Sequence, residues 1–258
     1  MELVIKNIEK SEQFVQIFQN IKNFCDCFNI NFSNEKMYIQ GMDTSHISVF
    51  EINLENNWFC EYKVNEDTVI GINGNIFQKI LSMWTSNHSI KLRLDDKNSD
   101  KINISFETID DKKNEFNKYY ELPLADLDCE VLNIPESEYT LDIEMNSKSF
   151  KKIVDELSTM GDTVTFNCDE TEMNVLTKSL EGNMNVKIPF DHVELYSIEE
   201  GSTISSSFTL KYIKLISVFS KITNNTKIHI TNDMPLLINY TLSEQSYIKF
   251  FLAPQCDN

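Results

Sequence analysis

The sequence predicts an α+β protein built from two similar halves, each with two helices packed on antiparallel sheet. Apolar residues recur at a fixed shift of 136 between the halves, short segments alternate apolar and polar residues, and four segments carry a helical apolar stripe. The 258 residues are 41% apolar and include only 6 Gly and 5 Pro. Such a chain can bury a core in each half.

The internal repeat appears when the first half is aligned with the second at a shift of 136. Letter identity is low, but apolar character is kept over most of each half, so we predict two copies of one domain. The matched positions include Phe14 and Phe150, Ile17 and Ile153, Phe18 and Val154, Ile21 and Leu157, Phe77 and Ile213, Ile80 and Ile216, and Ile102 and Ile238.

Each copy is expected to hold two helices and several short strands. The apolar spacing i, i+3, i+4, i+7 predicts a first helix over 11–25 and its counterpart over 147–159, with Ser147 as N-cap. Second helices are expected over 75–85 and 209–221. Alternation predicts antiparallel strands at 28–32, 37–40, 90–94 and 101–106, and in the second copy at 164–168, 173–176, 227–230 and 236–240.

A proline-containing acidic stretch, about 122–139, separates the copies and shows no sustained period. We interpret it as an extended linker that lies along the domain surface, because its apolar residues Leu127, Leu132 and Ile134 should be sheltered from water. The domain boundaries predicted from this are 1–121, a connector at 122–138, and 139–258.

Charge is distributed unevenly in a chain whose net charge is −17, a value that opposes general nucleic-acid binding. The windows 10–24, 75–85, 147–159 and 209–221 hold only three acids. Lysine is a good helix former, which is the alternative explanation, but Glu would serve equally well. We therefore favour a basic surface for the backbone of duplex DNA, independent of sequence. The nine lysines are Lys10, Lys22, Lys79, Lys148, Lys151, Lys152, Lys211, Lys214 and Lys221.

Catalytic and metal-binding patterns are missing from the sequence, so we expect no enzyme, no catalytic residue, no metal and no cofactor. Gly71-x-x-Gly74 lacks the Lys of a phosphate loop, and the acidic pairs at 95–96, 110–111 and 199–200 lack partners. No apolar run reaches membrane-spanning length and no signal peptide is seen, so we expect a soluble intracellular protein with reduced thiols. The isolated residues are His46, His88, His192, His229, Cys25, Cys27, Cys60, Cys129, Cys168 and Cys256.

Five short segments, in order along the whole chain, resemble proliferating cell nuclear antigen, the eukaryotic and viral family of DNA polymerase sliding clamps. Gly41–Val49 resembles a loop of that family, Asp126–Glu136 its interdomain connector, and Leu157–Asp162 the end of its third helix. Asp233–Leu236 and the C-terminal Phe251–Pro254 match further family segments. Each motif is weak alone, and their constant order and spacing make the resemblance strong.

The resemblance implies a DNA clamp fold that closes as a head-to-tail homotrimeric ring, with helices lining the hole. It implies a scaffold and not an enzyme, acting in DNA replication and repair. Strands that pair between subunits would lie at about 116–122 and 173–180. Departures at Val15, Gln16, Ser82, Asp155 and Val218, where the family has basic residues, imply a weaker grip on DNA. The DNA-facing positions are Lys22, Lys79, Lys152 and Lys211, joined by Lys148 and Lys214.

Partner proteins of the resembled family insert a short peptide into an apolar groove beneath the connector. Ordinary core packing is the alternative for each groove residue taken alone. Glu170 stands where many relatives carry a ubiquitin-accepting lysine, and Phe251 stands in place of a tyrosine. The groove positions are Met42, His46, Ile47, Val49, Leu132, Ile134, Pro135, Pro235, Phe251 and Ala253.

Partners implied by the resemblance are double-stranded DNA, DNA polymerase, a clamp loader, other proteins with clamp-binding peptides, and further copies of the chain; no membrane is implied. The expected location is the nucleus or, for a viral protein, the viral replication compartment. Two alternatives stay open from sequence: a monomeric viral-type processivity factor, and a subunit of a heterotrimeric checkpoint clamp.

Overall fold

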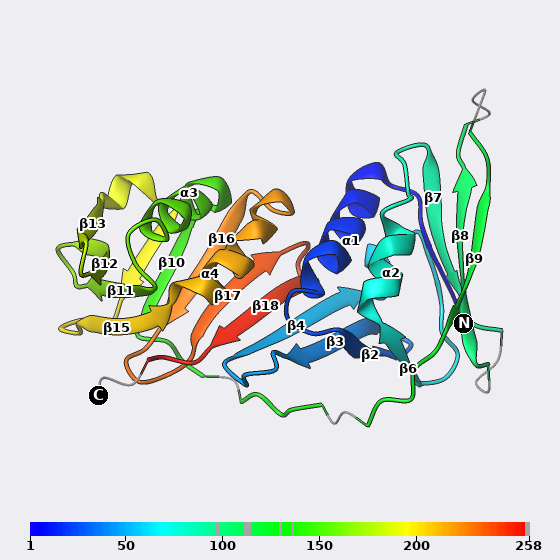
Figure 1. Cartoon of the computed structure of the whole chain (residues 1–258), viewed down its shortest axis with the longest axis horizontal. Helices are drawn as coiled ribbons and strands as arrows, with labels where there is room; N and C mark the ends of the chain where they lie inside the picture. The colour runs from blue at the N-terminus through cyan, green and yellow to red at the C-terminus, as the bar shows by residue number, and fades with distance from the viewer. Residues whose placement is uncertain (96–98, 111–114, 129–130, 136, 256–258) are drawn as a thin grey trace. The chain divides into compact units, whose positions relative to one another are not determined.

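A computed structural model of the chain describes residues 1–95, 99–110, 115–128, 131–135 and 137–255. It divides into two compact units, each of which is described by itself (Figure 1). The N-terminal unit comprises Met1–Thr44, Glu51–Leu132 and Ser243–Tyr247. The C-terminal unit comprises Ser45–Phe50, Asn133–Leu242 and Ile248–Asn258.

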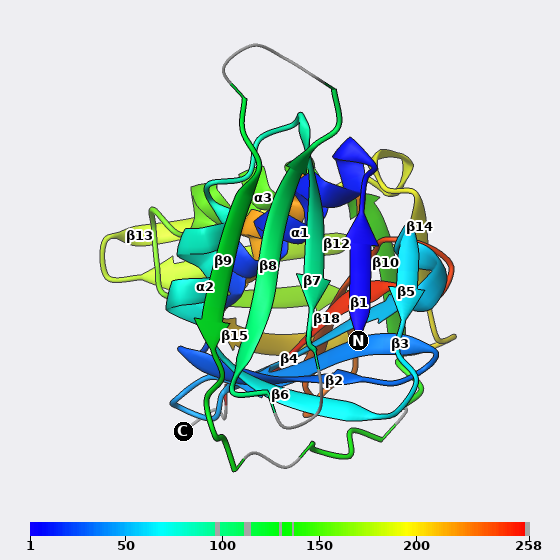
Figure 2. The same cartoon turned by 90° about the vertical axis from the view of Figure 1, so that its right-hand side faces the viewer.

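The N-terminal unit has two antiparallel sheets with two helices, as predicted. Its elements are β1 (Glu2–Ile5), α1 (Ile8–Ile21), β2 (Cys27–Phe32), β3 (Lys36–Met42), β4 (Ser48–Glu55), η1 (Asn56–Trp58), β5 (Glu61–Lys63), β6 (Thr68–Asn73), α2 (Gly74–Leu81), β7 (His88–Arg93), β8 (Lys101–Thr108) and β9 (Lys118–Pro123). One sheet has the order β5-β1-β7-β8-β9 and is seen face-on in Figure 2, and β6-β2-β3-β4 follow one another in the second.

The C-terminal unit repeats the order of strands and α-helices and adds one short helix, η3, after its second α-helix. Its elements are β10 (Leu141–Asn146), α3 (Ser147–Leu157), β11 (Thr163–Cys168), β12 (Met173–Ser179), β13 (Gly182–Ile188), η2 (Phe190–His192), β14 (Leu195–Ile198), β15 (Ile204–Thr209), α4 (Leu210–Ser217), η3 (Val218–Lys221), β16 (Asn225–Ile230), β17 (Leu236–Thr241) and β18 (Tyr247–Leu252). The strand orders are β14-β10-β16-β17-β18 and β13-β12-β11-β15.

The shift of 136 seen in the sequence is the offset between equivalent elements. Strands β2 and β11, strands β6 and β15, and helices α2 and α4 each begin 136 residues apart. All the matched apolar positions are buried except Ile153, which is half-buried. The prediction of two α+β copies is therefore confirmed, and the repeat follows from conserved burial of apolar side chains rather than from residue identity.

An aromatic cluster fills the core of the N-terminal unit beneath its helices. The Phe18 ring centroid lies 4.8 Å from those of Phe14 and Phe77, both edge-on, and 5.8 Å from that of Phe28. Offset and edge-to-face arrangements are the favoured geometries of aromatic pairs. Burial of each such ring contributes about 1.5–3 kcal/mol, so α1 is held mainly by this cluster.

The starts of both first helices differ from the prediction. Helix α1 begins three residues earlier, at Ile8, because the Asn7 side chain accepts a hydrogen bond from Lys10 N at 3.0 Å. In α3 the N-cap is Asn146, which accepts from Lys148 N and Ser149 N, both at 3.1 Å. The predicted cap Ser147 instead lies buried, with its Oγ 2.7 Å from Thr226 Oγ1. Asn146 is exposed and precedes the buried Ser147, so its side chain can accept hydrogen bonds from the first backbone amides of the helix.

The strand expected to pair between subunits at 173–180 is not available for that role. It forms β12, which is bonded on both sides within its own sheet, to β11 and to β13. A tight turn at 179–182 returns the chain as β13, and β13 is the edge strand of that sheet. The free edge therefore lies one strand later than predicted, because alternation alone does not show which strand of a hairpin is outermost.

The connector is extended and lies along the N-terminal unit at its start. Ala125 N donates to Gly71 O at 2.9 Å and forms an isolated antiparallel bridge with that residue on β6. A Cβ at position 71 would meet Ala125 O at 2.1 Å, so only glycine permits this approach. Leu127 is half-buried, but Leu132 is 43% exposed, which contradicts the expectation that it is sheltered.

Candidate nucleic-acid interface and peptide-binding surface

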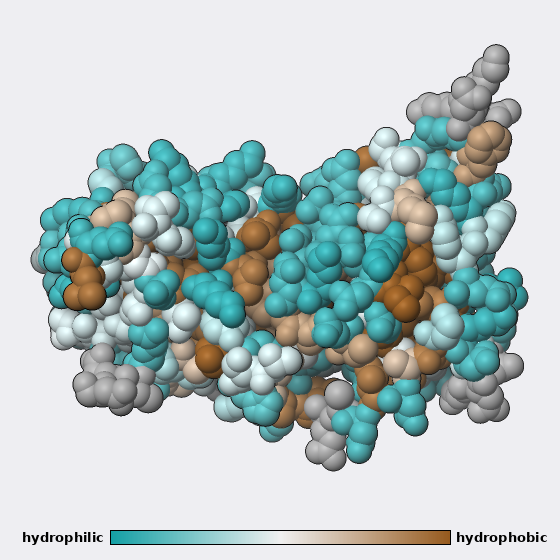
Figure 3. All heavy atoms as spheres, viewed as in Figure 1, coloured by the Kyte–Doolittle hydropathy of each residue, from teal (hydrophilic) through white to brown (hydrophobic). Residues whose placement is uncertain are grey.

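The predicted lysines of the N-terminal unit lie on or directly after its paired helices. Lys22, the C-cap residue of α1, is half-buried, and its Nζ donates to Gln78 Oε1 on α2 at 3.3 Å. Lys79 on α2 is exposed, and its ammonium has no ion pair or hydrogen bond within the part of the chain that the structure describes. Figure 3 shows the surface over these helices as mainly hydrophilic, with apolar residues exposed beside α2. Lys22 thus links α1 to α2 by a hydrogen bond, whereas Lys79 faces solvent.

The lysines of the C-terminal unit divide into free and paired groups. Lys148, Lys211 and Lys214 are exposed and form no ion pair with any described residue; the Lys211 ammonium lies 5.8 Å from the Tyr212 ring centroid. On α3, Lys151 Nζ lies 2.6 Å from Asp155 Oδ2 and Lys152 Nζ lies 3.9 Å from Glu156 Oε1. The predicted site residue Lys152 therefore already has an acidic neighbour.

The basic surplus of the helices is smaller than their predicted boundaries indicate. As formed, the four helices carry seven lysines and four carboxylates, because α1 starts early enough to include Glu9. Lys10 Nζ donates to Trp58 O at 2.8 Å and lies 5.5 Å from the Trp58 ring, so this lysine serves the fold. The surplus is concentrated on α2 and α4, which contain no acidic residue.

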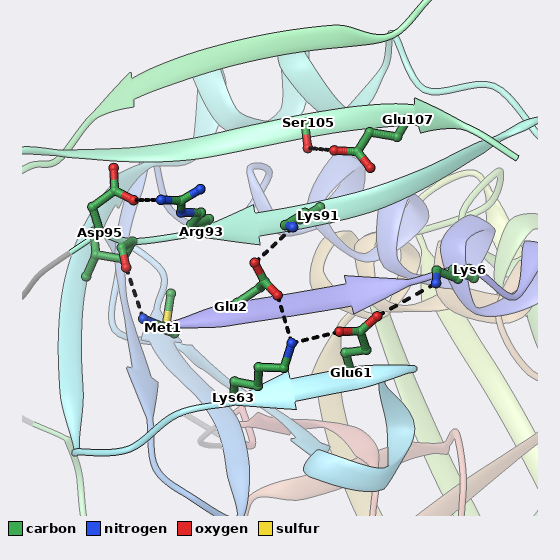
Figure 4. Close-up of polar contacts among 11 residues, drawn as sticks. Met1, Glu2, Lys6, Glu61, Lys63, Lys91, Arg93, Asp95, Ser105 and Glu107 are labelled. Carbon is green, nitrogen blue, oxygen red and sulfur yellow. Dashed lines mark hydrogen bonds and ion pairs between the residues drawn. The ribbon is translucent and has the colours of Figure 1, made fainter.

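On the sheets, by contrast, five lysines form ion pairs with carboxylates, and two of them, Lys63 and Lys91, are drawn in Figure 4. Glu2 accepts from Lys63 at 3.0 Å and from Lys91 at 2.9 Å, and these ammonium groups lower the pKa of Glu2 to about 2. Lys101, Lys187 and Lys227 reach carboxylates at 2.7, 2.9 and 3.9 Å. These five strand lysines are thus paired with acids, whereas the lysines of α2 and α4 form no ion pair with any described residue.

The ten predicted groove residues share one property: none is buried. They alternate with residues that are, since Ser48, Phe50, Leu236 and Leu252 have no exposed surface. Strand geometry sends alternate side chains to opposite faces, which explains the pattern at Val49 on β4 and Phe251 on β18. None of the ten is fully enclosed in a core, although Met42, Ile47, Val49, Ile134 and Phe251 are half-buried. Met42 and Leu132 belong to the N-terminal unit, and the other eight to the C-terminal unit.

Several contacts position these residues within their own units. In the C-terminal unit, Ala253 N donates to Ile47 O at 2.9 Å, which ties the loop before β4 to the end of the chain. In the N-terminal unit, Gln40 Oε1 accepts from Leu132 N at 2.6 Å and Gln40 Nε2 donates to Leu132 O at 3.0 Å. His46 adopts a left-handed backbone conformation with φ of 57°, one that side chains rarely take.

A cavity of about 330 Å³ lies in the N-terminal unit beside β2, β3 and β6, and no sequence motif predicts it. Val69 and Val131, 60% and 53% exposed, line it together with the half-buried Tyr38. Burial and the bond to Glu51 raise the pKa of Tyr38, so the phenol stays neutral and donates to that carboxylate at 2.7 Å. No local motif marks this cavity, because its walls come from strands and connector distant in sequence.

The residues considered for catalysis have structural partners or face solvent. His88 is buried, with Nε2 donating to Phe116 O at 3.0 Å, and His229 Nδ1 lies 2.5 Å from Asp142 Oδ1. Glu170 accepts from Gly201 N at 2.8 Å. Among the residues whose placement is described, no three His, Cys, Asp or Glu side chains are grouped to hold a metal.

The four cysteines at described positions, Cys25, Cys27, Cys60 and Cys168, form no disulfide, and burial raises the pKa of Cys168 to about 12. Cys129, Cys256, Asp96, Asp111 and Glu136 lie outside the described residues. None of the helices at described positions has both the length and the hydrophobicity of a membrane-spanning helix.

Two family models together match nearly the whole chain. Residues 4–131 match the model for the N-terminal domain of proliferating cell nuclear antigen, and residues 133–255 match the model for its C-terminal domain. Among curated proteins, the proliferating cell nuclear antigen of Chaetomium thermophilum is 29% identical over 257 residues, which is 96% of each chain. The similarity therefore extends over both units and is not confined to one motif.

Proposed function

We propose that this chain, which belongs to the proliferating cell nuclear antigen family of sliding clamps, encircles duplex DNA as a homotrimer and tethers replication and repair proteins there. Family membership supports the general role of a DNA polymerase processivity factor. The ring, the DNA-facing lysines and the peptide groove are our proposals for how the chain performs that role.

The observation that carries the DNA proposal is the contrast between neutralised and free lysines. Five of the lysines on strands, Lys63, Lys91, Lys101, Lys187 and Lys227, lie within 4 Å of a carboxylate. Lys79, Lys148 and Lys214 on the helices are exposed and form no ion pair with any described residue. In a chain of net charge −17, free ammonium groups on helices offer the phosphate backbone its favourable contacts. With Lys22, Lys152 and Lys211 they form the proposed DNA-facing set.

Ring closure is proposed through two sheet edges. Strand β9 ends one sheet of the N-terminal unit, and β13 ends one sheet of the C-terminal unit. Exposed apolar residues accompany both edges: Phe116 and Tyr119 at β9, and Leu180 in the turn before β13. Unpaired edges with apolar neighbours favour pairing with another chain, and pairing unlike edges produces a head-to-tail ring.

Partner proteins are proposed to bind at the exposed apolar residues around the connector and the end of the chain. Ile134 and Phe251 are half-buried, which leaves surface for an aliphatic or aromatic anchor of a short peptide. Polymerase and clamp loader are the expected carriers of such peptides. The proposed location is the nucleus or a viral replication compartment, and the chain acts as a scaffold without a catalytic step.

The test of encirclement is retention on circular DNA after loading. The variant in which Lys22, Lys79, Lys152 and Lys211 are changed to Glu should keep the mass of three chains in sedimentation but lose polymerase stimulation. The variant Phe116→Lys with Tyr119→Lys should instead sediment as a monomer. Unchanged processivity in the first variant would contradict the lysine assignment, and a monomeric wild-type chain would contradict the ring.

The groove has a separate test by calorimetry with a synthetic peptide that carries one helical turn of aliphatic and aromatic anchors. Ile134→Ala with Phe251→Ala should weaken binding at least tenfold, because truncating central anchors costs about 2 kcal/mol or more. Leu195→Ala, which removes an apolar side chain that is 47% exposed elsewhere on the C-terminal unit, serves as the matched control. Equal affinity for all three proteins would exclude the groove.

A further inference from the structure

Helix α3 differs from α2 and α4 because it carries acids that bond to its own lysines. Lys151 Nζ and Asp155 Oδ2 lie 2.6 Å apart, and Lys152 Nζ and Glu156 Oε1 lie 3.9 Å apart, each pair one helical turn apart. The two carboxylates are 42% and 47% exposed, so they share the solvent-facing side with the lysines. Helices α2 and α4 present lysines without any acid.

Helix stability does not account for this arrangement. The lysines stand in the first half of α3 and the acids at its end, next to the last helical residue, Leu157. A helix favours negative side chains near its N-terminus and positive ones near its C-terminus, and the acid-before-lysine order is the better one for pairs at i, i+4. Both preferences are reversed here. The acids thus oppose the helix dipole while they occupy two lysines.

We propose that Asp155 and Glu156 set the strength of the grip on DNA by acting as built-in counter-ions for Lys151 and Lys152. A phosphate that approaches α3 must displace a carboxylate or share its lysine, and it is repelled by the acid itself. Contact in the C-terminal unit then rests mainly on Lys148, Lys211 and Lys214, and the contribution of Lys152 to the DNA-facing set is weakened by Glu156. This inference rests on the proposed DNA-encircling function, and it makes the clamp a loosely held and therefore mobile one.

The variant Asp155→Asn with Glu156→Gln keeps the shape of both side chains and releases both lysines. In equilibrium binding to a labelled linear duplex, its affinity should rise, and the plot of log affinity against log salt should steepen by about 0.9 for each lysine that gains a phosphate. Elution from heparin should move to higher salt. The control Asp191→Asn with Glu199→Gln changes the net charge equally at exposed positions of the same unit without a lysine partner among the described residues.

A combined variant distinguishes release of Lys151 and Lys152 from a general effect of net charge on DNA affinity. With Lys151→Gln and Lys152→Gln already present, the two acid substitutions should add no more than the control does. An equal gain in the control, or an equal gain without the lysines, would overturn the inference.

Failure of the proposed function has a different signature. If wild-type protein is not retained on circular DNA but the heparin elution of the acid variant still exceeds that of the control, the counter-ion role stands and encirclement falls. If both acid variant and control elute with wild type, the counter-ion role is excluded whatever the DNA result.

Discussion

The two units share the order of their strands and α-helices, yet they differ at the short helix that follows their second hairpin. In the N-terminal unit, η1 buries Trp58, which is 1% exposed and packs at 5.2 Å against Phe59. In the C-terminal unit, η2 buries no residue, and Phe190 is 37% exposed, stacked 4.4 Å from Tyr196. The comparison teaches that equivalent short helices can carry a buried aromatic residue in one copy and a partly exposed one in the other.

Another contrast separates the first helix of each unit from the second helix of each unit. Helix α1 of the N-terminal unit commits Lys10 to the Trp58 carbonyl, and α3 of the C-terminal unit commits Lys151 to Asp155. Each first helix therefore uses lysine internally, while the second helices α2 and α4 leave lysine to solvent. Apolar spacing determines the fold of both copies, and the polar positions are free to diverge because they carry little of the folding energy.

The largest expected difference between the units lies at the aromatic residues of η1 and η2. Trp58→Ala should lower the free energy of unfolding by about 3–5 kcal/mol, because it removes a fully buried ring and leaves a cavity. Phe190→Ala should cost under about 1 kcal/mol, in line with an exposed side chain. Denaturant titrations of both variants measure these losses of unfolding free energy. Similar losses would show that Phe190 is packed as tightly as Trp58.

A second contrast concerns two glycines restricted for different reasons. Gly71→Ala should cost about 1–3 kcal/mol and loosen the connector, since its Cβ would collide with Ala125 O. A Cβ at position 201 would meet no atom within 4 Å. Gly201→Ala should therefore lower the free energy of unfolding by about 1 kcal/mol, only because alanine disfavours the backbone φ of 73°. Hydrogen exchange at the Ala125 amide should accelerate only in Gly71→Ala. Unchanged exchange there would mean that the connector tolerates the extra methyl.

The smallest expected effect is the pH dependence contributed by Glu2. Lys91 and Lys63 lower the pKa of Glu2 from 4.5 to about 2, so the carboxylate stabilises the folded state above pH 4.5. This contribution is lost as pH falls from 4.5 towards 2, and solvent screening limits it to about 1 kcal/mol or less. Glu2→Gln should flatten the stability profile in that window.

Sequence reasoning located the elements better than their ends. Helix α1 was expected from residue 11, but the cap is Asn7, because burial of Ser11 against the core cannot be seen from the helical stripe. The candidate site shows the same limit. Spacing alone places Lys79 and Lys148 on exposed helix faces, and i, i+4 spacing brings Lys151 near Asp155. Nothing local indicates that Lys10 bonds to a carbonyl 48 residues away.

Amino-acid order alone sets the α+β class, the two copies and the faces on which lysines stand, because apolar periodicity acts within a few residues along the chain. Tertiary packing determines which strand of a hairpin becomes an edge and which lysines remain available to a polyanion. It also explains why residue 71 must be glycine. These outcomes depend on contacts between residues far apart in sequence. For such contacts the spacing of neighbours carries no information until the backbone has folded.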